Sequence, residues 1–203
     1  MTLERSEGEG WPVSLDGVTE SLVATYGPNG RWNLAALGLF AGDPVTATTW
    51  GNTRTRRNFE REGEGVVQFT RDPRVFVEAA LGITELDEPV DDSADAWVRV
   101  AVDRIGTDER GGTRRETWAL TPVESELLSQ TVPTTNRGYF AVIDATVAAS
   151  RLDVPEYHRE TLLSRLSYYE SVVGRCGGER EREAFARIGE LTGWNEEREN
   201  ESF

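Results

Sequence analysis

The sequence predicts an α+β fold in which a small antiparallel β-barrel is followed by a C-terminal helical part. Segments of alternating or β-branched apolar residues, separated by short turns, follow one another up to about residue 124. Two pairs of these segments are joined by tight turns and predict β-hairpins. After Pro133 the apolar residues recur at intervals of three and four, which is typical of amphipathic helices. Strands followed by helices favour an α+β protein over a doubly wound sheet.

The first half of the expected barrel lies between residues 20 and 70. Strands are expected at 20–27, 31–42, 45–50 and 65–70, with a short helix at about 54–62. The Pro-Asn-Gly turn at 28–30 joins the first two strands into a hairpin, because these residue types favour tight turns. Asp43 and Pro44 mark the next turn, and the β-branched residues after them suit a strand.

A helix and a second hairpin complete this part. Asp72 is a good N-cap, Pro73 suits the first helical position and Gly82 is a stop signal, so 72–82 predicts a helix. An acidic linker is expected at 83–96. The alternating segments 97–109 and 113–124, joined by a glycine-rich turn, then predict the hairpin.

The rest of the chain predicts helices and sets the expected domain boundaries. Helices are expected at 139–152, 155–176 and 179–193. The expected organisation is a flexible lead-in at 1–18, a barrel domain at 19–135, a helical part at 136–193 that packs on the barrel, and a loose tail at 194–203.

The charge composition is unusual. The 203-residue chain carries 36 acidic and 22 basic residues, a formal net charge of -14, and contains no lysine. This composition is typical of halophilic proteins, whose self-repulsion is screened by concentrated salt. An acidic interaction surface is the alternative interpretation. Either way, the charge disfavours nucleic acid as a partner.

Several chemistries lose support from the residue inventory. Cys176 is the single cysteine and His158 the single histidine, so a disulfide, a cysteine- or histidine-built metal site and a Ser-His-Asp triad are not expected. The glycine-rich nucleotide-binding motifs and the zinc-protease motif are absent. Because no apolar run is long enough to cross a membrane and no signal-peptide pattern is present, a cytoplasmic protein without a membrane partner is expected.

One segment, 48–60, gathers hydrogen-bond donors and positive charge. Its side chains include three arginines, two hydroxyls and two amides: Arg54, Arg56, Arg57, Thr53, Thr55, Asn52 and Asn58. A helix start capped by threonine leaves free N–H groups, which bind phosphate well, and arginine adds bidentate pairing. The alternative is local charge compensation, in which Arg56 pairs with Glu60, Arg57 pairs with nearby acids and Thr53 merely caps the helix.

A run of small residues precedes this cluster. Ala35, Ala36 and Gly38 interrupt a strand that is otherwise bulky, which would let a flat ligand lie against the backbone. A tight barrel corner is the other explanation. Together, the small-residue strand and the donor cluster predict a slot for a planar ring with a phosphate tail.

The order of these segments resembles a known superfamily. The stretches ESLVATYGPNGRWNLAALGLF, VTATTWGNTRTRRNF and VVQFTRDPRVFVEAAL are similar to the FMN-binding split-barrel, flavin-reductase-like superfamily. More narrowly, the chain resembles an uncharacterised archaeal family with that barrel and a helical C-terminal part, to which residues 135–152 are also similar. The resemblance covers roughly residues 18–192.

This resemblance implies a homodimer with FMN near the subunit interface. Asn33, Ala35, Ala36 and Gly38 would border the isoalloxazine ring, and Thr48 and Thr49 would contact it through backbone groups. The phosphate would be held by Asn52, Thr53, Thr55 and Asn58 with Arg54 or Arg57.

The expected function is FMN binding, with a flavin-dependent oxidoreductase of unknown substrate as the leading hypothesis. No side chain is marked as a catalytic acid or base. The alternatives are a non-catalytic flavin-binding or electron-relay protein and an acidic dimeric scaffold that has lost its ligand.

Overall fold

The computed structural model describes residues 6–8 and 10–195, and the chain divides into two compact units. The first unit holds the chain up to Arg71 together with Ile83–Thr131. The second holds Asp72–Gly82 and the chain from Val132 onward. Helix α2, Pro73–Leu81, therefore belongs to the helical unit although strands flank it in the sequence.

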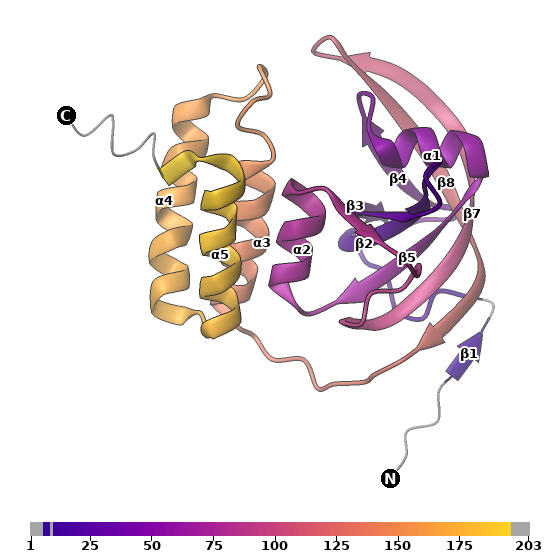
Figure 1. Cartoon of the computed structure of the whole chain (residues 1–203), viewed down its shortest axis with the longest axis horizontal. Coiled ribbons are helices and arrows are strands. Elements are labelled where there is room, and N and C mark those ends of the chain that lie inside the picture. The colour runs from indigo at the N-terminus through magenta and orange to yellow at the C-terminus, as the bar shows by residue number, and fades with distance from the viewer. Residues whose placement is uncertain (1–5, 9, 196–203) are drawn as a thin grey trace. The chain divides into compact units, whose positions relative to one another are not determined.

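The first unit is a closed antiparallel barrel (Figure 1). Its strands are β1 (Ser6–Gly8), β2 (Val18–Tyr26), β3 (Trp32–Phe40), β4 (Val45–Trp50), β5 (Glu64–Thr70), β6 (Thr84–Leu86), β7 (Ala94–Arg110) and β8 (Thr113–Leu127). In the described part of the chain, six strands pair in the order β8–β4–β3–β2–β5–β7, and the pairing of β7 with β8 closes the ring. β1 adds to β8 and β6 adds to β3.

Alternating apolar residues fill the barrel. Every strand of the ring contributes to one buried cluster, which includes Val23, Leu37, Leu39, Val45, Ala47, Val67, Val98, Val100, Val102, Trp118 and Leu120. Helix α1, Arg54–Glu62, adds Phe59, whose ring packs edge-to-face on Trp118 with centroids 5.4 Å apart. The barrel core thus consists of the inward-facing residues of the strands and one side chain from α1.

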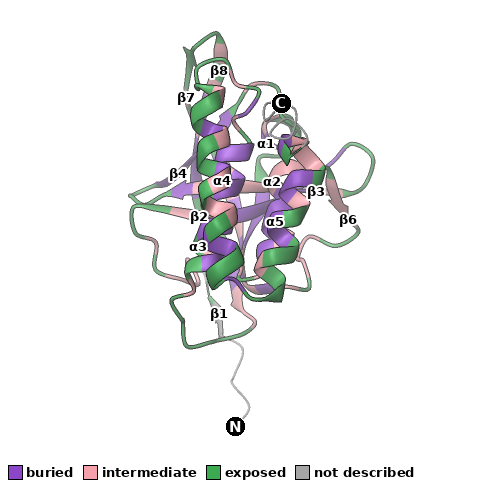
Figure 2. Cartoon of the chain, turned by 90° about the vertical axis from the view of Figure 1, so that its left-hand side faces the viewer, coloured by how far each residue is buried: buried purple, intermediate pink, exposed green. Residues whose placement is uncertain are grey.

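The second unit is a helical bundle with its own core. Besides α2 it contains α3 (Arg137–Ala149), α4 (Arg159–Cys176) and α5 (Glu179–Thr192). Their apolar stripes form a second buried cluster, and Figure 2 shows buried and exposed residues alternating along α4 and α5. Gly138 is required here, because a Cβ at this position would lie 2.4 Å from the Cα of Gly177.

The fold class expected from the sequence is confirmed, while three details differ. The lead-in is not wholly unstructured, because Ser6–Gly8 pairs with β8. The acidic linker contains β6, whose pairing with β3 supplies backbone hydrogen bonds that the local sequence does not signal. The expected tail begins at Trp194, but that side chain is 1% exposed and packs on Phe185; residues 196–203 lie outside the described residues.

Candidate functional site

Strand β3 changes partners along one edge. Near its end, Leu39 and Phe40 pair with β4, and near its start, Trp32–Leu34 pair with β6. Among the described residues, the stretch 35–38 between them pairs with β2 alone. The other edge of this stretch therefore carries backbone N–H and C=O groups outside any strand ladder.

Thr48 and Thr49 border the same interruption. If the register of Leu39 with Ala47 continued, Gly38 would stand opposite Thr48. Instead, within the described residues, Thr48 and Thr49 pair only with β8. We call this interruption, bordered by 35–38 and 48–49, the β3–β4 opening. It brings together the two stretches that the resemblance places beside a flavin ring.

The small residues of β3 lie on two faces of the strand. Leu37 points into the barrel core, so Asn33 and Ala35 share this inner face. Ala36 and Gly38 lie on the outer face. A planar ligand could therefore reach all four positions only along the backbone edge, and not through side chains on one face.

The packing of the described residues does not require glycine at position 38. A Cβ at this position would lie 3.5 Å from Val18 Cγ1, which is an ordinary contact distance. Its φ lies outside the left-handed region that favours glycine. The described chain leaves room beside the β3–β4 opening that a larger residue could fill.

Helix α1 follows β4 after a three-residue loop and presents free backbone donors. Thr53 is its N-cap, with Oγ1 accepting a hydrogen bond from Arg56 N at 3.2 Å. Gly63 ends the helix in the left-handed conformation with φ 67°. The N–H groups of Arg54 and Thr55 have no hydrogen-bond partner in the described part of the chain. These groups carry the positive end of the helix dipole.

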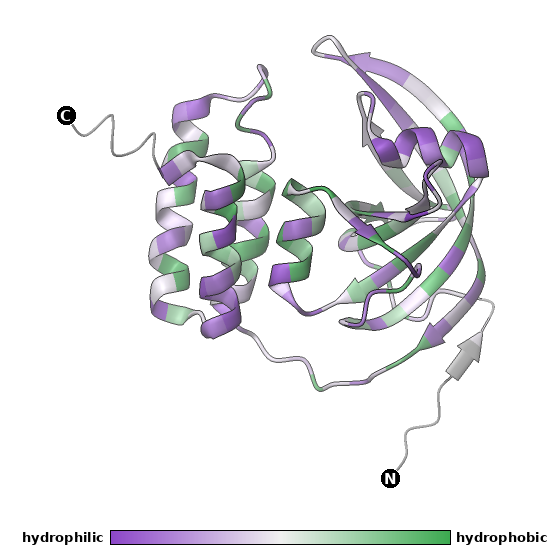
Figure 3. Cartoon of the chain, in the orientation of Figure 1, coloured by the Kyte–Doolittle hydropathy of each residue, from purple (hydrophilic) through white to green (hydrophobic). Residues whose placement is uncertain are grey.

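The loop before α1 is held by arginine contacts. Arg57 Nη1 donates to Asn52 O at 2.9 Å and to Asn52 Oδ1 at 3.1 Å. Arg56 Nη2 donates to the same Oδ1 at 3.1 Å. Arg54 Nη1 pairs with Glu85 Oε1 at 2.7 Å. Figure 3 shows how hydrophilic α1 is along most of its length.

Strand β6 brings one β3 residue to this helix start. Asn33 stands opposite Glu85 in the β3–β6 ladder, and Glu85 holds Arg54. The structure therefore places Asn33, Arg54, Asn52, Thr53 and Arg57 around the start of α1.

Two of the predicted phosphate ligands face the barrel instead. Thr55 and Asn58 are buried on the same side of α1 as Phe59. Asn58 Nδ2 donates to Thr25 Oγ1 at 3.0 Å and to Thr25 O at 3.3 Å. The amide nitrogen of Asn58 is therefore engaged in holding α1 against β2.

Glu116 was missed by the sequence-based reasoning. Its side chain is 0% exposed and lies on the inward face of β8 with Trp118 and Leu120. Its Oε1 lies 3.4 Å from Arg56 Nη1. The available signal was an acidic residue at an inward position of the alternating segment 113–124.

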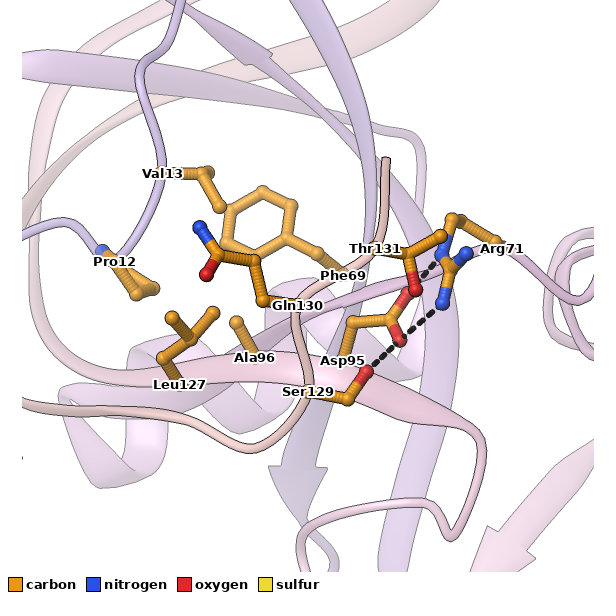
Figure 4. A pocket seen from close by; sticks show the side chains of 10 residues that line it. All are labelled: Pro12, Val13, Phe69, Arg71, Asp95, Ala96, Leu127, Ser129, Gln130 and Thr131. Atoms are coloured by element: carbon orange, nitrogen blue, oxygen red, sulfur yellow. Dashed lines mark hydrogen bonds and ion pairs between the residues drawn. The ribbon is translucent and has the colours of Figure 1, made fainter. Parts of the chain in front are cut away.

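A separate pocket of about 300 Å³ lies at the other end of β5, where Arg71 pairs with Asp95 (Figure 4). Arg71 donates to both Asp95 oxygens, at 2.6 and 2.8 Å. This hydrogen bonding lowers the pKa of the Asp95 carboxyl, with a further contribution from Ser129, whereas burial opposes the shift. The Arg71 guanidinium is thus already engaged by a carboxylate.

The described residues contain neither a candidate membrane span nor a candidate metal site. None of the helices there has the length and apolarity needed to cross a membrane. No cluster of three or more histidine, cysteine, aspartate or glutamate side chains there is arranged to hold a metal ion.

Comparison with known families and structures gives clear matches. Residues 19–129 match the N-terminal-domain model of a family described as "protein of unknown function (DUF447)", and residues 136–190 match the second model of that family. The crystal structure of an FMN-bound protein from Methanosarcina mazei, of the same family, is similar with a TM-score of 0.77 and 25% identity. The match covers 87% of this chain and 96% of that one.

Weaker similarities involve two further structures. The styrene monooxygenase flavin reductase of Pseudomonas putida S12 has a TM-score of 0.38 and 12% identity, covering 58% of this chain and 93% of that one. A flavoredoxin from Methanosarcina acetivorans has a TM-score of 0.36 and 15% identity, covering 56% and 73%.

Proposed function

This chain belongs to the DUF447 family, and we propose that it binds FMN at the β3–β4 opening and the start of α1. The Methanosarcina mazei structure of this family is FMN-bound, which supports the same cofactor here. The observation that carries the proposal is the interruption of strand pairing between 35–38 and 48–49, next to a helix start with free N–H groups.

The ring end of the site offers backbone groups and little bulk. The unpaired edge of Ala35–Gly38 can donate and accept hydrogen bonds along a flat ligand. The edges of Thr48 and Thr49 offer the same groups from β4. A polar, planar heterocycle such as isoalloxazine matches this arrangement.

The phosphate end offers donors of three kinds. The free N–H groups of Arg54 and Thr55 supply backbone donors at the positive end of α1. The Thr53 hydroxyl supplies a second kind and the Arg57 guanidinium a third. In this proposal Asn58 keeps α1 on the barrel and does not touch the phosphate.

We further propose a flavin-dependent oxidoreductase. Bound FMN would supply the one- or two-electron redox chemistry. The residues of this chain would bind the ring, orient it and hold its phosphate. No side chain is assigned as a catalytic acid or base.

A homodimer is part of the proposal. Val18 and Phe40 stand opposite each other in the β2–β3 ladder, beside Gly38, and are 55% and 45% exposed. A second copy would cover these apolar side chains. In molar salt, sedimentation should give a dimer for the wild type and a monomer for Phe40→Glu. A monomeric wild type would contradict this part of the proposal.

FMN binding is tested by titration. The apo-protein in molar salt should quench the fluorescence of added FMN in a saturable way. A chain that remains colourless and leaves the fluorescence unchanged would overturn the cofactor proposal.

For the oxidoreductase, the FMN-loaded protein should lose its visible flavin absorbance when NADH or NADPH is added without oxygen. Retained absorbance with both donors would favour a non-catalytic flavin binder.

A further inference from the structure

We propose that Glu116 is a positioning residue that makes the site prefer a phosphorylated flavin over an unphosphorylated one. It would do so by anchoring Arg56, which holds the phosphate-binding loop. This inference rests on the proposed FMN function and assigns a role to a residue outside the expected site.

Glu116 is a fully buried charged group on the inward face of β8. Its side chain is 0% exposed, on the same face of β8 as Trp118 and Leu120. A carboxylate in such a place is costly unless cations and hydrogen bonds surround it. It stands opposite Thr49 in the β4–β8 ladder, so it lies close to the β3–β4 opening.

Three guanidinium groups surround one oxygen of this carboxylate. Oε1 lies 3.4 Å from Arg56 Nη1 and 3.5 Å from Arg104 Nη1, and it also pairs with Arg114. The Arg56 side chain is the most enclosed of the three at 14% exposed, against 41% and 53% for the others. Of the three guanidinium groups, that of Arg56 therefore has the least access to water in place of Glu116.

The buried polar atoms of the Glu116–Arg56 pair do not all have hydrogen-bond partners in the described part of the chain. Among the described residues, the second oxygen of Glu116 and the Nε of Arg56 are buried without a hydrogen-bond partner. Unpaired buried polar groups weaken a fold, so stability alone is a poor reason for this arrangement. A role in positioning a neighbouring site accounts for it.

A continuous series of contacts leads from Glu116 to the loop before α1. Arg56 meets Glu116 through Nη1 and donates through Nη2 to Asn52 Oδ1 at 3.1 Å. Asn52 in turn accepts two hydrogen bonds from Arg57 Nη1. Glu116 thus orients Arg56, Arg56 fixes Asn52, and Asn52 fixes Arg57.

The three arginines at the start of α1 have different partners. Arg54 is paired with Glu85, and Arg56 is paired with Glu60 and Glu116. In the described part of the chain the Arg57 guanidinium donates only to the neutral oxygens of Asn52 and pairs with no carboxylate. The geometry points to Arg57 as the guanidinium that meets the phosphate, with Arg56 as its support.

The test compares FMN with riboflavin, which has the same ring and no phosphate. Dissociation constants for both are measured with wild type and Glu116→Gln in molar KCl. Removing the buried negative charge of Glu116 would by itself favour the anionic FMN, so a loss of FMN affinity in this variant would report lost positioning and not a direct charge effect. We expect FMN to bind about tenfold more weakly to the variant, the loss of one charge-assisted hydrogen bond, and riboflavin to bind unchanged.

The matched control is Glu124→Gln, which removes a carboxylate from the same strand at an exposed position paired with Arg99. It should change neither constant. If Glu116→Gln does not fold, Arg56→Met interrupts the same series and should give the same selective loss. Adding Asn52→Ala to either variant should cost less than the two single losses combined, because both act through one loop.

Equal losses for FMN and riboflavin would overturn the inference, because they would mean a general structural role. Unchanged or tighter FMN binding to Glu116→Gln would overturn it as well. In both cases a wild type that binds FMN leaves the proposed function standing. A wild type that binds neither flavin would overturn the proposed function and this inference together.

Discussion

The indole Nε1 of Trp118 donates a hydrogen bond to Thr49 Oγ1 at 2.9 Å, and both side chains are buried. The hydroxyl of Thr49 is therefore used inside the barrel. At the β3–β4 opening, Thr49 therefore offers a ligand its backbone groups.

Thr49→Val should destabilise the barrel because it leaves the Trp118 N–H buried without an acceptor. The expected loss of unfolding free energy is about 1–3 kcal/mol, measured by urea denaturation. The matched control is Thr48→Val, at a half-buried neighbouring position, which should change stability by about 0.5 kcal/mol or less. Equal losses in the two variants would contradict a specific role for the hydrogen bond.

Thr53→Ala should affect both stability and FMN affinity. The cap of α1 is lost, at a cost of about 1 kcal/mol, and the helix start that would hold the phosphate becomes less ordered. Thr53→Ser keeps the capping oxygen and should restore both properties. Thermal unfolding and FMN titration provide the measurements, and a serine variant as weak as alanine would contradict the explanation.

Asn58 and Asn52 should behave in opposite ways when replaced by alanine. Asn58→Ala removes buried hydrogen bonds to Thr25 and should lower stability by about 1–3 kcal/mol, while the folded protein keeps its FMN affinity. Asn52→Ala, in the exposed loop, should leave stability nearly unchanged and weaken FMN binding. A loss of FMN affinity in folded Asn58→Ala would return this residue to the phosphate site.

The Arg71–Asp95 pair should make stability depend on pH. Folding lowers the pKa of the Asp95 carboxyl below its ordinary value of 3.8. The stabilisation of the folded state by this carboxylate is therefore present above pH 3.8 and is lost as the pH falls through the folded-state pKa. Asp95→Asn should therefore reduce stability at pH 7 by about 1 kcal/mol, with the difference shrinking in acid. Asp103→Asn, at an exposed position on β7, is the matched control for the loss of one acidic charge.

Salt should stabilise the protein. With a formal net charge of -14, mutual repulsion of surface carboxylates opposes folding, and salt screens it. The midpoint of thermal unfolding should rise steadily from low salt to molar KCl. A midpoint that is independent of salt or falls with it would contradict the halophilic interpretation.

Local signals predicted much of the fold. The helix expected at about 54–62 is α1, Arg54–Glu62, because Thr53 caps it and Gly63 stops it, and both act over a few residues. Strand β6 was missed, because three residues form a strand only when a distant partner, here β3, supplies the hydrogen bonds. In the candidate site, too, some features depend on neighbouring residues and others on distant ones. A threonine cap, at Thr53 or Thr55, was predicted from the local sequence, and the structure places it at Thr53. The inward orientation of the Asn58 side chain depends instead on its hydrogen bond to Thr25.

By itself, the sequence determined the two periodicities, and with them the barrel and the helices, because the pattern of apolar residues decides which face is buried. It also determined the donor cluster at 48–60 and the acidic charge. Only the tertiary structure decided which donors in that cluster remain available. Arg56 is taken by Glu116, 60 residues away, and Arg54 by Glu85, whereas Arg57 keeps only neutral partners. Ion pairs depend on distance in space, and no local pattern states which distant carboxylate will be folded against which arginine.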